Sequence, residues 1–187
     1  MIGQVSVIIL ATAFQVISTQ GPPPLLPNIP PQCQGPPEGA EKPHECCKIP
    51  PFFKDADFEE CGFKKMDDEV EGPQRERGGP PDCSKQLCMM KKYNLAKGEE
   101  IDYEAMNQFM DKWTESNPEF KDSVNAAKDR CIGKPLPGPP HVCEANKIVF
   151  CVSSTMIENC PKWEESEGCQ KWKSHITECA PFFHRKV

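Results

Sequence analysis

Twelve cysteines constrain the fold of this chain more than any other feature of its 187 residues. Their number is even and all of them follow residue 32, so six disulfides could use every one. The count alone leaves on the order of 10⁴ possible pairings. Because the neighbours Cys46 and Cys47 must diverge, they are expected to reach different partners. The cysteines are Cys33, Cys46, Cys47, Cys61, Cys83, Cys88, Cys131, Cys143, Cys151, Cys160, Cys169 and Cys179.

Metal binding is the alternative use of so many cysteines. The chain has no Cys-x-x-Cys pair, and its four histidines do not lie at zinc-finger spacing. The pattern therefore favours disulfides, and we expect no metal and no other cofactor.

The first twenty residues predict a signal peptide. They carry no charged side chain and contain an apolar run from Val5 to Ile17, and the small residues Ser18, Thr19 and Gly21 offer a cleavage zone. The run is too short to span a membrane, and a buried N-terminal helix is the alternative. No second apolar run follows, so we expect a secreted protein of about 165 residues that forms one domain and is not inserted in a membrane.

The formal charge of −6 bears on the partners of the protein. Nucleic acids and anionic membranes are negatively charged and attract basic proteins. An acidic chain is therefore expected to bind neither, and its charge is expected to serve solubility.

Proline and apolar spacing divide the chain into an arm, a helical domain and a tail. Residues 21–45 are rich in proline and predict an extended arm, residues 46–179 a helical domain, and residues 180–187 a tail. Within the domain a charged loop is expected at 66–81. Helices are expected from Asp55 to Lys65, after an Asp82 N-cap, after Asp102, after Asn117-Pro118, from Cys143 to Pro161, and from about Lys162 to Ile176.

The helix that ends at Pro161 is expected to join two other parts of the chain. Cys151 and Cys160 lie nine positions apart, which places them on opposite faces and about 13 Å apart along the axis. A disulfide allows a Cα separation of only about 7 Å. Each of the two must therefore reach a different neighbouring element.

Methionine and aromatic residues are frequent on the expected inner faces. Met89, Met90, Met106, Met110 and Met156 are flexible and polarisable, so they suit a cavity that adapts to apolar guests. Ordinary core packing is the alternative.

The cysteine spacing resembles that of insect odorant-binding proteins of the Plus-C subgroup. Cys88 is followed by Met-Met-Lys-Lys-Tyr-Asn-Leu-Ala-Lys-Gly, about forty residues lead on to Cys131, and Cys151 and Cys160 are separated by eight residues, with Pro161 next. The resemblance covers roughly residues 44–179. It implies an all-α, disulfide-braced domain with the pairs Cys83–Cys151, Cys131–Cys160 and Cys61–Cys88. The six other cysteines would tie the arm and the C-terminal extension to the core.

The resemblance implies a carrier of small hydrophobic odorants or pheromones in a fluid such as sensillar lymph. It also implies two macromolecular partners, a second copy of the chain and an odorant receptor. Phe182 and Phe183 would cover the cavity mouth or a subunit interface, and His184 would make this pH-sensitive; a frayed terminus is the alternative. The cavity would be lined by Met90, Met106, Phe109, Met110, Trp113, Phe120, Val124, Phe150, Val152 and Met156.

An enzyme and an interaction or inhibitor protein are the alternatives to a carrier. Secreted phospholipases A2 also have a Cys-Cys pair, but Lys48-Ile-Pro-Pro follows Cys46-Cys47 here in place of the catalytic His and Asp. The chain also lacks the Gly-x-Ser-x-Gly and His-Glu-x-x-His motifs, so we expect no enzyme. A secreted interaction or inhibitor protein would present an exposed loop, for which residues 72–81 are the candidate.

Overall fold

A computed structural model describes residues 29–39, 42–63 and 83–183 of the chain. The expected all-α class is confirmed, with six disulfides bracing the helices. Two 3₁₀ turns, η1 and η2, and one short hairpin complete the described structure. In chain order the elements are η1 (Pro31–Cys33), α1 (Pro43–Cys46), α2 (Asp55–Glu60), α3 (Ser84–Lys92), β1 (Ala96–Lys97), β2 (Glu100–Ile101), α4 (Tyr103–Ser116), η2 (Pro118–Phe120), α5 (Lys121–Cys131), α6 (Glu144–Glu158) and α7 (Glu167–Phe183).

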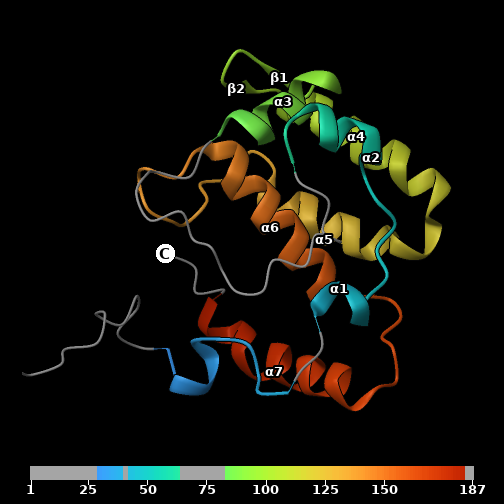
Figure 1. Cartoon of the computed structure of the whole chain (residues 1–187), viewed down its shortest axis with the longest axis vertical. Coiled ribbons are helices and arrows are strands. Elements are labelled where there is room, and N and C mark those ends of the chain that lie inside the picture. The colour runs from blue at the N-terminus through green and yellow to red at the C-terminus, as the bar shows by residue number, and fades with distance from the viewer. Residues whose placement is uncertain (1–28, 40–41, 64–82, 184–187) are drawn as a thin grey trace, which may run out of the picture.

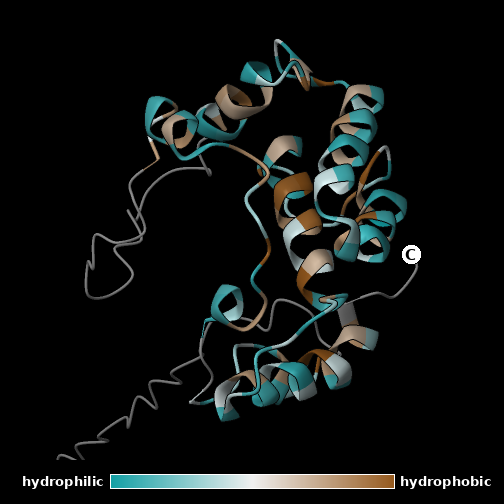
Figure 2. Cartoon of the chain, turned by 90° about the vertical axis from the view of Figure 1, so that its right-hand side faces the viewer, coloured by the Kyte–Doolittle hydropathy of each residue, from teal (hydrophilic) through white to brown (hydrophobic). Residues whose placement is uncertain are grey.

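The helices form two layers, which Figures 1 and 2 both show. The larger layer holds α2 to α6, with α5 and α6 packed against each other at its centre. The smaller layer holds α7, against which η1 and α1 lie. The hydrophobic core belongs mainly to the larger layer, because its buried apolar side chains come from α3, the hairpin, α4, η2, α5 and α6.

The predicted start of α4 is confirmed. The Asp102 side chain accepts a hydrogen bond from the Ala105 backbone N–H at 3.0 Å, as expected for an N-cap. This bond is the main reason why the pKa of Asp102 is lowered. Asp102 therefore fixes where the helix begins and which of its faces meets the core.

The hairpin between α3 and α4 was not predicted. Ala96 pairs with Ile101, and Gly98 turns the chain at φ +64°. The strands are only two residues long, too short to show an alternating pattern. Buried Leu95 and Ile101 nevertheless anchor the hairpin on the core.

Several predicted boundaries were wrong or lie outside the described residues. The last helix runs from Glu167 to Phe183, later than predicted, and the Ser166 hydroxyl accepts the Cys169 N–H near its start. The arm is not wholly extended, because Pro31 and Pro43 begin short helical turns, where proline is tolerated. Asp82 lies outside the described residues, and Cys83 holds the N-cap position of α3.

The six disulfides form two separate sets. Three nested bridges, here called the outer ladder, join the N-terminal arm to the C-terminal extension: Cys33–Cys179, Cys46–Cys169 and Cys47–Cys160. The other three stay within the larger layer: Cys61–Cys88, Cys83–Cys143 and Cys131–Cys151. The two layers are therefore braced largely independently.

One of the implied pairs is confirmed and two were wrong. Cys61 pairs with Cys88 as implied. Cys83 pairs with Cys143 and not with Cys151, because the N-cap positions of α3 and α6 meet. Cys131 pairs with Cys151, since the end of α5 packs against α6.

Cys160 is the remaining correction, because it pairs with Cys47 and not with Cys131. It follows the end of α6, where the chain turns toward the smaller layer. The expectation that Cys151 and Cys160 fasten α6 to different elements is confirmed.

Candidate functional site

The structure gathers most of the predicted ligand-binding residues in one place. Those that lie in the hydrophobic core, each no more than 6% exposed, are Met90, Met106, Met110, Phe120, Val124 and Met156. Phe109, Trp113 and Val152 are partly buried and pack against this core. The methionines of α3, α4 and α6 therefore meet, although far apart in the sequence.

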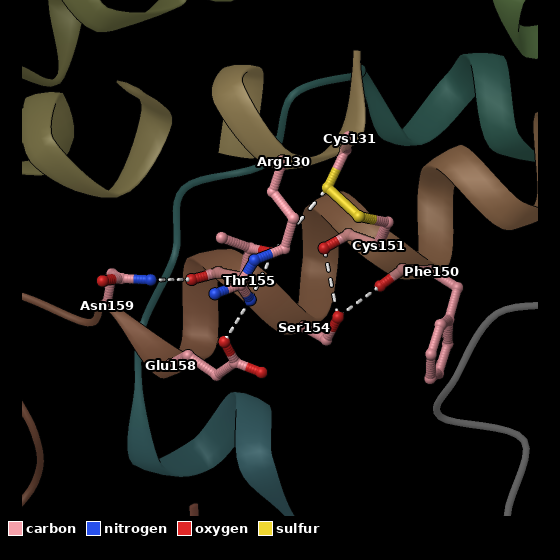
Figure 3. Close-up of a disulfide and its surroundings, with 8 residues drawn as sticks. All are labelled: Arg130, Cys131, Phe150, Cys151, Ser154, Thr155, Glu158 and Asn159. Atoms are coloured by element: carbon pink, nitrogen blue, oxygen red, sulfur yellow. Dashed lines mark hydrogen bonds and ion pairs between the residues drawn. A yellow bond between two sulfur atoms is a disulfide. The ribbon is translucent and has the colours of Figure 1, made fainter. Parts of the chain in front are cut away.

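Phe150 does not belong to this set, contrary to the prediction. Its side chain is 76% exposed, and in Figure 3 its ring points away from the Cys131–Cys151 bridge. Ile148, two positions earlier on α6, is buried. Two helical positions correspond to about 200° of rotation, so a helix that buries Ile148 must expose Phe150.

The predicted tail residues lie apart from the core. Phe182 is half-buried near the end of α7, in the smaller layer, and is not among the core residues. The side chain of Phe183 and all of His184 lie outside the described part of the structure. The expected role of these residues at a cavity mouth stays a prediction.

A chain of aromatic rings extends the core toward the surface. We call it the aromatic ladder, and each ring contacts at least one other ring within 6.4 Å. All of the rings except the buried Phe120 are half-buried. The members are Phe52, Phe53, Phe58, Phe63, Tyr93, Phe109, Trp113 and Phe120.

Half of the ladder comes from a segment in which a helix was predicted from Asp55 onward, but none of whose rings was assigned to the ligand site. Residues 48–63, here called the strap, contribute Phe52, Phe53, Phe58 and Phe63. The Phe53 ring stacks on Phe109 with centroids 5.5 Å apart. Two phenylalanines directly after Pro50-Pro51 were the available signal, because apolar rings in a non-helical segment must pack on something.

Polar contacts hold the middle of the strap on α3. The Lys54 backbone N–H donates to the Tyr93 hydroxyl at 3.1 Å, and this hydroxyl donates to the Asp57 carboxylate at 2.7 Å. Lys92 adds an ion pair with Asp57 at 2.9 Å. The Tyr93 bond, followed by Lys92, lowers the pKa of Asp57, while burial and the Asp57 bond raise the pKa of Tyr93.

Tyr93→Phe is expected to raise the pKa of Asp57 toward its ordinary value of 3.8. A carboxyl whose pKa is lowered by folding stabilises the fold above its unfolded pKa, and this stability is lost as the pH falls through the folded pKa. The variant should therefore lose part of the pH dependence of stability below about pH 4. An NMR titration of the Asp57 carboxyl measures the shift directly.

Tyr103→Phe is the matched control for this experiment. The Tyr103 hydroxyl donates to Glu144, which is the main cause that raises the pKa of Tyr103 to about 12. This contact joins α4 to α6 and does not involve the strap. An Asp57 pKa that is the same in Tyr93→Phe as in the wild type would contradict the prediction.

Two hollows on the described surface lie away from the predicted ligand-binding residues. One, of about 790 Å³, follows α3 and is lined by residues that include Leu87, Lys91 and Glu99. The other, of about 460 Å³, lies between the end of α6 and α7, beside Trp163. None of the predicted ligand-binding residues lines either hollow.

The Cys131–Cys151 bridge has a polar surround that joins α5 to α6 (Figure 3). The fully buried Thr155 hydroxyl lies 3.7 Å from the Cys131 sulfur and accepts a hydrogen bond from Arg130 at 3.2 Å. Arg130 also pairs with Glu158. These contacts satisfy a buried hydroxyl and hold the two helices in register.

Among the described residues, no three His, Cys, Asp or Glu side chains are grouped so as to hold a metal ion. Within the same residues, no helix has the length and apolar character needed to cross a membrane.

Fold and site together define a disulfide-braced, all-helical domain with a core rich in methionine and aromatic rings. No protein-family model matches the chain. No relative was found among curated proteins.

Proposed function

We propose that this protein is a secreted carrier that reversibly binds small hydrophobic molecules and delivers them toward chemosensory receptors. Such molecules dissolve poorly in water, and burial lowers their free energy by about 25 cal/mol per Å² of apolar surface. Carriage of this kind needs no chemical reaction. The cysteine spacing, which resembles that of odorant-binding proteins, and the six-disulfide helical fold are both compatible with it.

The continuity between the half-exposed aromatic ladder and the methionine core carries this proposal. Phe109 and Trp113 lie on the same helix as Met106 and Met110, and their rings pack on the core that these methionines form. Methionine side chains change shape at low cost and accept varied apolar neighbours. A guest that displaced a ladder ring would therefore reach adaptable side chains next.

Displacement of a fluorescent apolar probe tests the proposal. N-phenyl-naphthylamine is expected to gain fluorescence with the oxidised protein and to be displaced by hydrophobic volatiles. Met110→Ser should weaken probe binding, because it places a hydroxyl at a position that is 2% exposed in the core. Phe150→Ser is the matched control and should leave it unchanged, since Phe150 lies outside the core.

Absence of probe binding in the wild-type protein would remove the carrier proposal. It would favour the alternative of a secreted interaction or inhibitor protein, whose candidate loop at 72–81 lies outside the described residues. The carrier proposal includes two partners, an odorant receptor and a second copy of the chain. Binding to each of them is to be tested with the ligand-loaded protein.

A further inference from the structure

The strap contacts both the ring face and the N–H group of the Trp113 indole. The Phe52 ring stacks on the indole face, with centroids 4.4 Å apart and planes 24° from parallel. The indole Nε1–H donates a hydrogen bond to the Pro51 carbonyl oxygen at 3.2 Å. The face and the polar edge of one side chain are thus satisfied by two consecutive residues.

These two groups form a single small chemical unit. The Pro51 carbonyl carbon is linked to the Phe52 ring through the Phe52 nitrogen, Cα and Cβ. The compound N-phenethylacetamide contains the same atoms in the same order. The strap therefore presents to Trp113 what a free aromatic amide of this size would present.

Disulfides hold the strap at its ends, and between them it is held by noncovalent contacts, which include those of Lys54 and Asp57 with Tyr93. Cys47–Cys160 fixes the chain before it, and Cys61–Cys88 fixes its far end. Between these bridges, Phe52 is only half-buried and the Trp113 hydrogen bond lies at an exposed position. Phe52 can therefore leave the indole without the breaking of any disulfide.

A ligand at this position would have further apolar contacts. Phe120 meets the Trp113 ring edge-on at 5.7 Å, and Phe109 lies 6.4 Å from the Phe52 ring. A benzene ring that replaced Phe52 would keep the contacts of Phe52 with Phe109 and Trp113. A plain alkyl chain would bury apolar surface there but would leave the indole N–H without its acceptor.

We propose that Trp113 is the recognition residue of a ligand site for small aromatic carbonyl compounds, and that Phe52 and the Pro51 carbonyl occupy this site as a tethered substitute. This inference rests on the proposed carrier function and names the class of ligand. Phe52→Ala empties the ring position while leaving the disulfides and Trp113 in place.

Calorimetric titration with two matched compounds tests the site. N-phenethylacetamide carries the ring and the carbonyl, whereas pentylbenzene carries the ring without an acceptor. Phe52→Ala is expected to tighten binding of the amide about fivefold relative to wild type, since the competing ring is removed. Adding Trp113→Phe should reverse this gain, with less than a twofold effect on pentylbenzene, because the variant keeps a ring but loses the N–H donor.

A heteronuclear NMR spectrum locates the binding, because the indole N–H signal that Trp113→Phe removes belongs to Trp113. That signal should shift when the amide binds to Phe52→Ala. Phe150→Ala, on the exposed face of α6, is the matched control and should bind both compounds as wild type does. Circular dichroism of each variant shows whether the helices are retained.

The results separate this inference from the carrier function. If adding Trp113→Phe to Phe52→Ala changes binding of both compounds equally, or the Trp113 signal does not move, the site is not at Trp113 although the protein still carries apolar guests. If neither compound nor the fluorescent probe binds any variant, both proposals are wrong.

Discussion

Removing two adjacent disulfides of the outer ladder, each here called a rung, is expected to lower the free energy of unfolding by about 5 kcal/mol. The rungs are Cys46–Cys169 and Cys47–Cys160, and the variant replaces all four cysteines with alanine. Removing Cys47–Cys160 alone should cost only about 3 kcal/mol, although its cysteines lie 113 residues apart. While Cys46–Cys169 is intact, the inner rung closes a loop of only about ten residues in the unfolded chain, and a short loop restricts that chain less.

Urea denaturation followed by circular dichroism measures both values. Removing Cys61–Cys88, which spans 27 residues within the larger layer, is the matched control. It should cost about 3 kcal/mol whether or not Cys47–Cys160 is present, because the two bridges belong to different sets. The prediction is wrong if removing Cys47–Cys160 alone lowers the free energy of unfolding as much as removing both disulfides. That result would mean that Cys46–Cys169 does not restrain the unfolded chain when Cys47–Cys160 is absent.

Periodicity and capping predicted the helices because both are local properties. Asp102 and the spacing of Met106 and Met110 placed α4 and its inner face correctly. The disulfide partners depend on which helix ends meet, which is a property of the whole fold. Cys143 caps the start of α6 and Cys151 lies within it, and nothing in this local sequence distinguishes which of them faces the start of α3.

In the candidate site too, the residues that follow a local helical pattern could be predicted, and those placed by contacts distant in the sequence could not. Methionines at helical spacing were predicted to line a cavity, with core packing as the alternative, and most of them lie in the core. The strap has no helical spacing around Phe52 and Phe53, so no periodic pattern assigned these rings to the face of α4. Phe150 was the opposite error: it was predicted to line the cavity because it lies beside buried positions of the helix, yet its side chain is exposed.

Met156 and Phe150 allow the stability cost of truncating a buried side chain to be compared with that of truncating an exposed one on the same helix, α6. Met156→Ala is expected to lower the free energy of unfolding by about 3 kcal/mol, because the Met156 side chain is 0% exposed and its removal leaves a cavity in the core. The six disulfides restrain the unfolded chain in the same way in both variants, so they do not offset the loss.

Phe150→Ala should change the same quantity by no more than about 0.5 kcal/mol, since 76% of the Phe150 surface is already in water. Alanine also has a higher helix propensity than phenylalanine, which favours a small gain. Both variants are compared with wild type by urea denaturation under oxidising conditions. A large loss in Phe150→Ala together with a small loss in Met156→Ala would mean that α6 presents the opposite face to the core, and the methionine core would then lose its central helix.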